Sequence, residues 1–180
     1  FIALPENRAI LATVREWMQR HRLPGWDPRR HEGLLRYLVL RRSFATGEWL
    51  AALVTATPPE GWPGQELADR LEALGATGVI HAVHDSPAGA VRVDRSEVLR
   101  GRDGIVERLG DLSFELSWRS FFQSNPPAFA TMLEEARAWV APGPTDRVLD
   151  LFCGVGTVGL SLCRHGGRLV GVETVPEAVE

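Results

Sequence analysis

The sequence contains no lysine, so all 20 of its basic side chains are arginine, and it has only two cysteines, Cys153 and Cys163. Two cysteines are too few for a disulfide framework and are typical of a protein in a reducing cytoplasm. No apolar run approaches the ~18–20 residues that a membrane-spanning helix needs. The opening residues, 1–5, carry no basic flank and do not form a secretory signal. We therefore expect a cytoplasmic protein with no membrane contact, of which this chain is an internal part.

The composition is that of an ordinary globular protein, with 44% hydrophobic and 24% charged residues in a chain of 180. This length is enough for one sizeable domain or two small ones. The net charge of −3 is unevenly distributed. Residues 1–57 hold nine arginines and five acids, residues 58–125 hold seven and eleven, and residues 126–180 hold four and seven. A basic region beside an acidic remainder permits a polyanionic partner such as a nucleic acid.

The first part of the chain predicts a helix followed by a β-hairpin. Apolar residues recur at helical spacing within residues 10–18. The branched and aromatic stretch 34–41 predicts a strand, and the turn 44–47 leads into a second strand over 48–57. The proline- and glycine-rich stretch 58–64 then predicts a break in regular structure.

The next segment predicts a short helix and further strands. Three leucines on one face of the helix are expected to point inward: Leu67, Leu71 and Leu74. We expect this helix to end at Gly75, and strands to follow over 79–84 and within 91–118. The clearest alternation of apolar and polar residues lies at 112–118. Together these elements predict an α+β domain, dominated by antiparallel sheet, over residues 1–120, which would support a nucleic-acid partner.

The pattern changes near Ser120. Asn125 predicts a helix N-cap, with Pro126 at the first helical position. Five apolar residues are expected to form the buried stripe of this helix: Phe129, Met132, Leu133, Ala136 and Val140. The helix is followed by a predicted strand over 147–152.

Helices and strands continue to alternate up to the last residue. A glycine-rich turn at 154–159 and a helix over 160–164 lead to a second strand over 168–173, and another helix is expected from Pro176. This alternation predicts a parallel α/β sheet. Residues 121–180 are therefore expected to form the opening, incomplete part of a Rossmann-like domain.

The glycine-rich turn predicts a site for a nucleoside ligand at the ends of the two strands. Gly154 and Gly156 let the backbone turn tightly and approach a ligand, because neither has a Cβ atom. Glu173 follows Gly156 by 17 residues, at the tip of the second strand, where its carboxylate can accept hydrogen bonds from an adenosine ribose. Gly154, Gly156 and Gly159 also satisfy G-x-G-x-x-G, so a nicotinamide or flavin dinucleotide is an alternative ligand.

Asp150, at the tip of the first strand, favours a cationic ligand over a dinucleotide. Its carboxylate would repel a pyrophosphate and would attract the ammonium and sulfonium groups of S-adenosyl-L-methionine. We therefore predict S-adenosylmethionine as the cofactor, with Asp150, Gly154, Gly156 and Glu173 at its site. A glycine turn that binds no ligand is the structural alternative.

Two blocks of sequence resemble a known family. Residues 120–125 read Ser-Phe-Phe-Gln-Ser-Asn, and residues 148–157 read Val-Leu-Asp-Leu-Phe-Cys-Gly-Val-Gly-Thr. Both are similar to segments of the RNA 5-methyluridine methyltransferases, bacterial and archaeal enzymes that act on ribosomal or transfer RNA. Residues 31–36 and 101–107 resemble the central domain of that family, so the resemblance spans nearly the whole chain.

The resemblance implies an S-adenosylmethionine-dependent RNA methyltransferase that acts on C5 of a uridine. It implies that Gln123, Phe152 and Thr157 contact the methyl donor together with Glu173. Phe121 would lie beside a uracil flipped out of its RNA stack, where an aromatic face replaces the lost stacking. Two arginines of the first strand are candidates for contacts with RNA phosphate or the flipped base, although a solvated strand face explains them almost as well: Arg36 and Arg41. The expected partner is ribosomal or transfer RNA, and no DNA is expected.

No catalytic residue is predicted within the chain. The chemistry of the family uses a cysteine thiolate that adds to C6 of uracil and a base that removes the C5 proton. The resemblance places both groups after residue 180, so this chain alone is expected to be inactive and Cys153 is expected to be structural. His81 and His84 are predicted to point to opposite faces of a strand, so no metal site is expected.

Three other functions stay open at this stage. One is a methyltransferase for another substrate, against which the block around Phe121 and Gln123 argues. The second is a dinucleotide-binding Rossmann protein, which the glycine pattern permits. The third is a nucleotide- or RNA-binding module that is not an enzyme.

Overall fold

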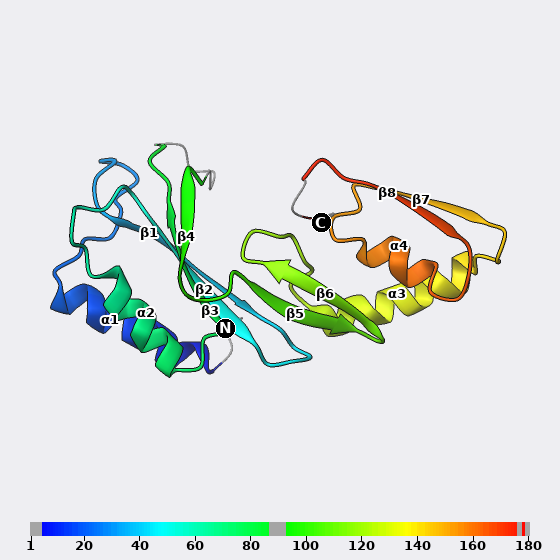
Figure 1. Ribbon diagram of the computed structural model, residues 1–180, viewed down its shortest axis with the longest axis horizontal. Coiled ribbons are helices and arrows are strands. Elements are labelled where there is room, and N and C mark those ends of the chain that lie inside the picture. The colour runs from blue at the N-terminus through cyan, green and yellow to red at the C-terminus, as the bar shows by residue number, and fades with distance from the viewer. Residues whose placement is uncertain (1–4, 87–92, 176–177, 179–180) are drawn as a thin grey trace. The chain divides into compact units, whose positions relative to one another are not determined.

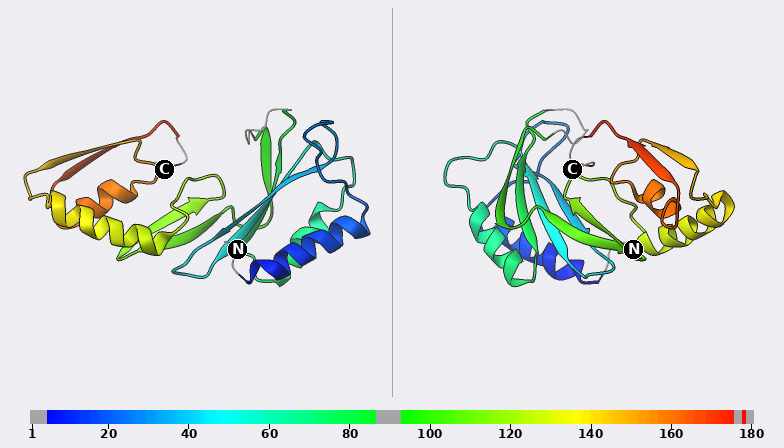
Figure 2. Two further views of the ribbon diagram at one scale, coloured as in Figure 1. Left: turned by 180° about the vertical axis from the view of Figure 1, so that it is seen from behind. Right: turned by 45° about the vertical axis from the view of Figure 1, so that its right-hand side comes forward.

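The computed structural model describes residues 5–86, 93–175 and 178. Contacts between residues divide the chain into two compact units. The first comprises Phe1–Arg42 and Glu48–Ile105, and the second comprises Ser43–Gly47 and Val106–Glu180. Figures 1 and 2 show the helices and strands of each unit. No helix among the described residues is long and apolar enough to cross a membrane.

A mixed four-stranded sheet forms the centre of the first unit. Its strands lie side by side in the order β1 (Leu35–Arg42), β2 (Trp49–Thr55), β3 (Gly78–Val83) and β4 (Arg95–Gly101). The pairs β1–β2 and β3–β4 are antiparallel, whereas β2 and β3 are parallel. A parallel pair needs a crossover connection, and α2 (Gly64–Ala73) provides it. The predicted hairpin is confirmed, and the sheet is antiparallel except at its central pair.

The core of the first unit lies between this sheet and two helices, α1 (Asn7–Arg20) and α2, which lie along one face of it (Figure 1). Trp17 of α1 is fully buried, and its indole nitrogen donates a hydrogen bond to Pro63 O over 3.0 Å. The strands β2 and β3 are buried at every position. Burial of one leucine side chain contributes about 1.5–3 kcal/mol, so this helix-on-sheet layer is the main source of stability of the unit.

The end of α2 is set by Gly75, as predicted. Gly75 has a φ of +91° and its amide donates to Glu72 O over 2.8 Å, while the Ala76 amide donates to Leu71 O over 3.1 Å. This pair of hydrogen bonds is a Schellman motif, which satisfies carbonyls that the helix end leaves open. The prediction that Leu74 points inward is wrong, since α2 ends at Ala73 and the Leu74 side chain, beyond the last turn, is 44% exposed.

The second unit contains a two-stranded hairpin followed by a helix and a parallel βαβ segment. Its elements are β5 (Gly104–Leu109), β6 (Leu112–Ser117), α3 (Pro126–Val140), β7 (Arg147–Leu151), α4 (Thr157–Leu162) and β8 (Arg168–Val172). Phe114, Leu116 and Trp118 are buried, as the alternation over 112–118 predicted. β7 and β8 pair in parallel, so the predicted parallel α/β arrangement is confirmed for this segment.

A buried carboxylate joins β5 to the turn after β1. Glu107 is 1% exposed, and its carboxylate accepts hydrogen bonds from Ser43 Oγ (3.0 Å), the Phe44 amide (2.7 Å) and the Ala45 amide (3.0 Å). These contacts explain why the turn 43–47 belongs to the second unit. Contacts also group β6, and β5 from Val106 onward, with the later elements of the chain. The sequence predicted a domain boundary near residue 120, and that boundary stays a prediction.

Two details of the second unit differ from the sequence prediction. In α3, Met132 is 51% exposed and Val140 is 55% exposed, because the helix packs mainly against α4 along the narrower stripe of Phe129 and Leu133. Helix α4 begins at Thr157, earlier than the predicted start at residue 160, since Gly156 at its N-cap already has a φ of +77°. The helix predicted from residue 176 and the strand start at residue 91 lie outside the described residues.

Candidate functional site

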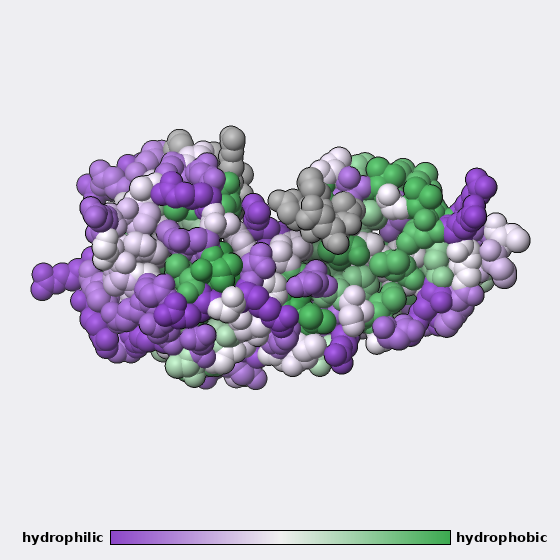
Figure 3. All heavy atoms as spheres, in the orientation of Figure 1, coloured by the Kyte–Doolittle hydropathy of each residue, from purple (hydrophilic) through white to green (hydrophobic). Residues whose placement is uncertain are grey.

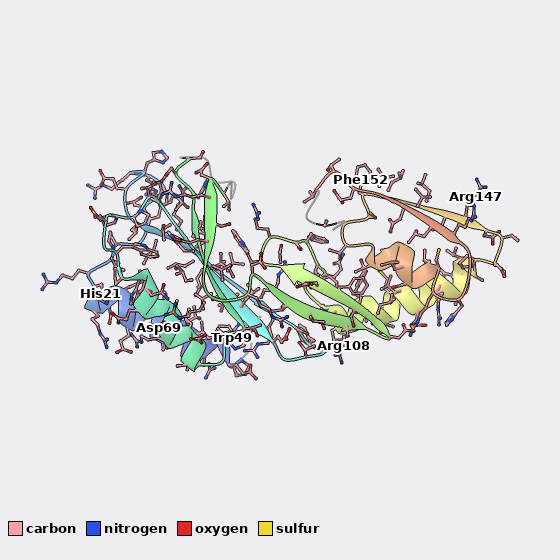
Figure 4. The ribbon with its side chains drawn as sticks, viewed as in Figure 1. His21, Trp49, Asp69, Arg108, Arg147 and Phe152 are labelled. Atoms are coloured by element: carbon pink, nitrogen blue, oxygen red, sulfur yellow. The ribbon has the colours of Figure 1, made fainter. Side chains whose placement is uncertain are left out.

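The chain leaves β7 through a tight turn with three positive φ angles. Phe152 has a φ of +61°, Gly154 of +55° and Gly156 of +77°. Glycine adopts this conformation without steric cost, but a side chain in the left-handed region costs about 1–2 kcal/mol. Phe152 is also 84% exposed, at the end of β7 in Figure 4. A strained and exposed aromatic residue beside two glycines indicates a site that meets a ligand.

Asp150 fastens the start of α4 to β7. Its Oδ2 accepts a hydrogen bond from the Gly159 amide over 2.8 Å. A Cβ atom on Gly159 would lie 2.5 Å from Leu169 Cδ1 and 2.8 Å from Asp150 Oδ2, so only glycine fits where helix and strands meet. This is the packing role of the third glycine in G-x-G-x-x-G. The predicted attraction of Asp150 for a cationic ligand stays a prediction. The structure adds a second role for Asp150, which is to position the start of α4 through its hydrogen bond with Gly159.

Glu173 closes the turn from the β8 side. Its Oε2 accepts a hydrogen bond from the Gly154 amide (2.9 Å), and its Oε1 accepts from the amides of Thr174 (2.6 Å) and Val175 (3.0 Å). The hydrogen bonds from the Val175, Gly154 and Thr174 amides lower the pKa of Glu173, so the group is ionised at neutral pH. Oε2 accepts one hydrogen bond within the described chain, and a carboxylate oxygen has two lone pairs. It therefore has capacity for a ligand hydroxyl.

A pocket of about 240 Å³ brings several of these groups together within the second unit. Its described lining residues are Ser117, Arg119, Ser120, Phe121, Gly154, Glu173, Val175 and Ala178. Phe121, 76% exposed, thus lies at the same pocket as Gly154 and Glu173, although the three are far apart in sequence. The pocket combines an aromatic ring, an apolar side chain and a carboxylate.

The sequence did not identify the pocket residues on β6 and just after it. Ser117 Oγ and Ser120 Oγ lie 2.9 Å apart and hold the bend that leads to Phe121. Arg119 lies at the pocket, with its guanidinium 5.7 Å from the centroid of the Trp118 ring. Alternation over 112–118 predicted only a strand here, and the Ser-Phe-Phe-Gln block drew attention to the following residues only through the family resemblance.

Two predicted cofactor residues, Gln123 and Thr157, are not among the described residues that line this pocket, and neither is Cys153. Gln123 is exposed before α3, whose N-cap Asn125 accepts a hydrogen bond from the Ala128 amide over 3.2 Å. Thr157 is half-buried as the first residue of α4. Cys153 is half-buried, and its amide donates to Val172 O over 3.1 Å, which fits a structural residue. The predicted contacts of Gln123 and Thr157 with the methyl donor stay predictions.

The two predicted RNA-binding arginines lie in the first unit. The Arg36 guanidinium lies 4.2 Å from the centroid of the Trp26 ring, and its Nη1 donates to His84 O (2.7 Å) and Ser86 O (2.8 Å). Arg36 thus joins β1 to the chain after β3. Arg41 is half-buried, and this burial lowers its pKa. A contact of either residue with RNA stays a prediction.

The two histidines of the β3 region are buried within the first unit. His81 is 4% exposed, with Nε2 2.9 Å from Thr55 Oγ1 and Nδ1 3.1 Å from Glu97 Oε1. His84 is fully buried just after the strand. Among the described residues no cluster of three histidine, cysteine or acidic residues is placed to hold a metal ion.

Known proteins similar to this chain are RNA methyltransferases. A Clostridium acetobutylicum protein, named an uncharacterized RNA methyltransferase, is 36% identical over 177 residues, which are 96% of this chain and 39% of that protein. A Caldanaerobacter subterraneus subsp. tengcongensis protein of the same description is 35% identical over 180 residues, again 96% of this chain and 39% of that protein. No protein-family model matches the chain.

A solved structure shares the fold. The crystal structure of Pyrococcus abyssi tRNA (uracil-54, C5)-methyltransferase in complex with S-adenosyl-L-homocysteine matches with a TM-score of 0.76 and 24% identity. The match covers 96% of this chain and 41% of that one. At this identity the likeness shows the fold alone.

The fold and the glycine-rich turn together define an α/β protein whose candidate ligand site lies at the carboxyl ends of parallel strands. The relatives specify the family further. The chain is similar to these RNA methyltransferases over almost its whole length, which confirms the family resemblance found in its sequence. It spans about two fifths (39%) of the length of the curated relatives it matches.

Proposed function

We propose that this chain is part of an S-adenosylmethionine-dependent RNA methyltransferase that methylates C5 of a uridine in ribosomal or transfer RNA. The observation that carries the proposal is the pocket shared by Phe121, Gly154 and Glu173. It places a predicted base-contacting ring beside a predicted cofactor loop. The relatives support methylation of RNA, and the Pyrococcus abyssi enzyme of the same fold, a tRNA uracil-C5 methyltransferase solved with S-adenosyl-L-homocysteine, supports both the base and the cofactor.

The residues at the turn fit an adenosyl ligand. The ionised Glu173 carboxylate has room at Oε2 for a ribose hydroxyl, and the glycine backbone leaves space beside it. The exposed Phe152 ring offers an apolar face for an adenine. Gly154 has no atom within 4 Å of the position of a Cβ, so a ligand can approach its backbone closely. S-adenosylmethionine, when bound, supplies an activated methyl group; the residues described here bind and orient it.

Phe121 has the position and exposure to contact the target base. Its ring is 76% exposed at the rim of the pocket, and the Ser117–Ser120 bend fixes the backbone that carries it. Stacking on an aromatic side chain compensates a base for leaving its RNA stack, by about 1–3 kcal/mol. We expect methyl transfer itself to need residues beyond this chain, since the family resemblance places the nucleophile and the base after residue 180.

The test is calorimetric titration of the 180-residue chain with S-adenosyl-L-homocysteine. Glu173→Gln keeps the size of the side chain and removes its charge, so we expect affinity to fall about tenfold or more. Glu115→Gln is the matched control, because Glu115 is an exposed carboxylate on β6; it should leave affinity unchanged. Circular dichroism would confirm that both variants keep the fold.

Three results would contradict the proposal. One is equal affinity in wild type and Glu173→Gln, which would remove Glu173 from the site. Another is NAD binding more tightly than S-adenosyl-L-homocysteine, which would favour the dinucleotide alternative. The third is the absence of any adenosyl-ligand binding by the folded wild-type chain. Methyl transfer to RNA by the 180-residue chain would overturn the expected location of the nucleophile.

A further inference from the structure

Arg8 and Arg15 lie on the exposed side of α1 in the first unit, and Arg22 lies just past the helix C-cap. Arg8 and Arg15 are seven residues apart, which is two helical turns with a drift of about 20°. All three are exposed, and none has an ion pair or hydrogen-bonded side-chain partner among the described residues. Arg8 and Arg15 are about 10 Å apart along the axis, given a rise of about 1.5 Å per residue. We call Arg8, Arg15 and Arg22 together the α1 arginine line.

The other arginines near α1 are neutralised. Arg20 Nη2 lies 3.0 Å from Glu16 Oε1, Arg20 Nη1 lies 3.2 Å from Glu66 Oε1, and Arg70 Nη2 lies 2.6 Å from Glu16 Oε2. Hydrogen bonding to Arg70 is the largest cause that lowers the pKa of Glu16, so this carboxylate is ionised and engaged. Glu16 is the only acid in Asn7–Arg20. The α1 arginine line thus has no counter-charge on its own helix.

The end of the line is held in an unusual conformation. Arg22 has a φ of +52°, a left-handed conformation that costs a non-glycine residue about 1–2 kcal/mol. Its amide donates to Gln19 O over 3.2 Å, which fixes it just past His21, the helix C-cap labelled in Figure 4. The surface over α1 and α2 is largely hydrophilic in Figure 3. Arg22 therefore adds a third exposed arginine just past the end of the helix.

We propose that the α1 arginine line binds the phosphate backbone of RNA. The inference rests on the proposed function in one respect, that the polyanion is RNA. The three guanidinium groups have no ion-pair partner among the described residues, and Arg8 and Arg15 are separated by about the screening length of physiological salt, ~8–10 Å, so their potentials add at a strand laid along them. Arginine also binds phosphate in a bidentate manner, which suits contacts that hold RNA without reading its sequence. The excess of arginine over acids in residues 1–57 points the same way.

The experiment measures how the affinity of the 180-residue chain for a short, mixed-sequence, single-stranded RNA depends on salt, by fluorescence anisotropy. Each phosphate contact contributes about 0.7 to the slope of log K against log salt for a single strand. Arg15→Gln should lower the slope by about 0.7, and the triple variant Arg8→Gln/Arg15→Gln/Arg22→Gln by about 2. Arg20→Gln is the matched control: it removes one charge from the same helix, but from a guanidinium engaged by two glutamates.

The outcomes separate this inference from the proposed function. A slope lowered by Arg15→Gln and not by Arg20→Gln supports the inference, whether or not the chain binds S-adenosyl-L-homocysteine. Equal slopes for Arg15→Gln and Arg20→Gln would show a general effect of net charge and overturn it. An unchanged slope in the triple variant would also overturn it and would indicate that the line faces water or an acidic protein. Adenosyl-ligand affinity, measured on the same variants, should stay unchanged, because the line lies outside the pocket unit.

Discussion

Glu173 Oε2 lies 2.9 Å from the Gly154 amide nitrogen, so the residue after β8 fixes the turn after β7. The two parallel strands alone would leave this turn free to move, because glycine has the widest range of backbone conformations. The hydrogen bond holds the turn in one shape before any ligand arrives. A ligand that meets Glu173 therefore meets a turn already arranged, which reduces the entropy cost of binding.

The contact between Asp150 and Gly159 leaves no room for a side chain. We expect Gly159→Ala to destabilise the chain by about 1–3 kcal/mol, because the new Cβ would overlap Leu169 and the Asp150 carboxylate. Urea unfolding followed by circular dichroism measures this change. Gly25→Ala is the control, since Gly25 has no atom within 4 Å of its Cβ position and no positive φ. Equal stability of the two variants would contradict the packing role assigned to Gly159.

The buried carboxylate of Glu107 supports the turn at residues 43–45. Glu107→Ala removes the acceptor for the Phe44 and Ala45 amides and for Ser43 Oγ. Each unsatisfied buried donor costs about 1–3 kcal/mol, so we expect a loss of about 3 kcal/mol in the free energy of unfolding. Thermal unfolding would detect it, and Glu115→Ala, at an exposed position of β6, should change stability little. If Glu107→Ala lost no more stability than Glu115→Ala, water would replace the carboxylate as the acceptor.

His81 should make the stability of the first unit depend on pH. Burial is the main cause that lowers its pKa below the ordinary histidine value of 6.5, and Glu97 partly opposes this. The folded pKa is thus below the unfolded one, so the unfolded chain binds more protons as the pH falls through 6.5. The contribution of neutral, buried His81 to the stability of the fold is present above pH 6.5 and is lost on acidification. We expect the melting temperature to fall between about pH 7.5 and pH 5.5.

The substitution His81→Gln should reduce that pH dependence. His31→Gln serves as the control because His31 is exposed. Melting curves recorded for wild type and both variants across the same pH range compare the slopes directly. A slope for His81→Gln as steep as that of the wild type would assign the pH dependence to other groups.

The N-cap of α3 fixes where the segment from Phe121 to Gln123 ends. Asn125→Ala removes the side-chain acceptor for the Ala128 amide, and we expect a loss of about 1 kcal/mol in stability. Asn125→Asp keeps an acceptor and should retain most of it. Chemical denaturation of the two variants makes the comparison. If both lose the same stability, the cap contributes through something other than this hydrogen bond.

Features set by neighbouring residues were predictable from the sequence. Asn125 and Pro126 marked the start of α3, and Gly75 marked the end of α2, because capping depends on local hydrogen bonds. The parallel pairing of β2 and β3 was not predicted, since strand direction depends on how the crossover through α2 packs. The bonds of Glu107 to the turn at residues 43–45 join segments more than 60 residues apart, which no local pattern encodes.

The candidate site likewise contains some features that the sequence predicted and others that it did not. Gly154 and Glu173 were predicted from spacing, because the ends of adjacent parallel strands meet at one edge of a sheet. The direction of the Asp150 carboxylate toward Gly159 follows from helix packing that the sequence alone did not show. Ser117 and Arg119 lie at the pocket because the chain bends after β6, and no periodic pattern marks that bend.

The complete burial of β2 and β3 has a consequence for how the chain opens. Amides in a strand with covered faces and a bonded neighbour on each side exchange with solvent only when the surrounding unit unfolds. The central pair of the four-stranded sheet meets these conditions, whereas β7 and β8 form a two-stranded sheet with Leu149 and Val170 more than half exposed. Deuterium uptake should therefore be slowest at β2 and β3, and the segment that carries the ligand turn should open first.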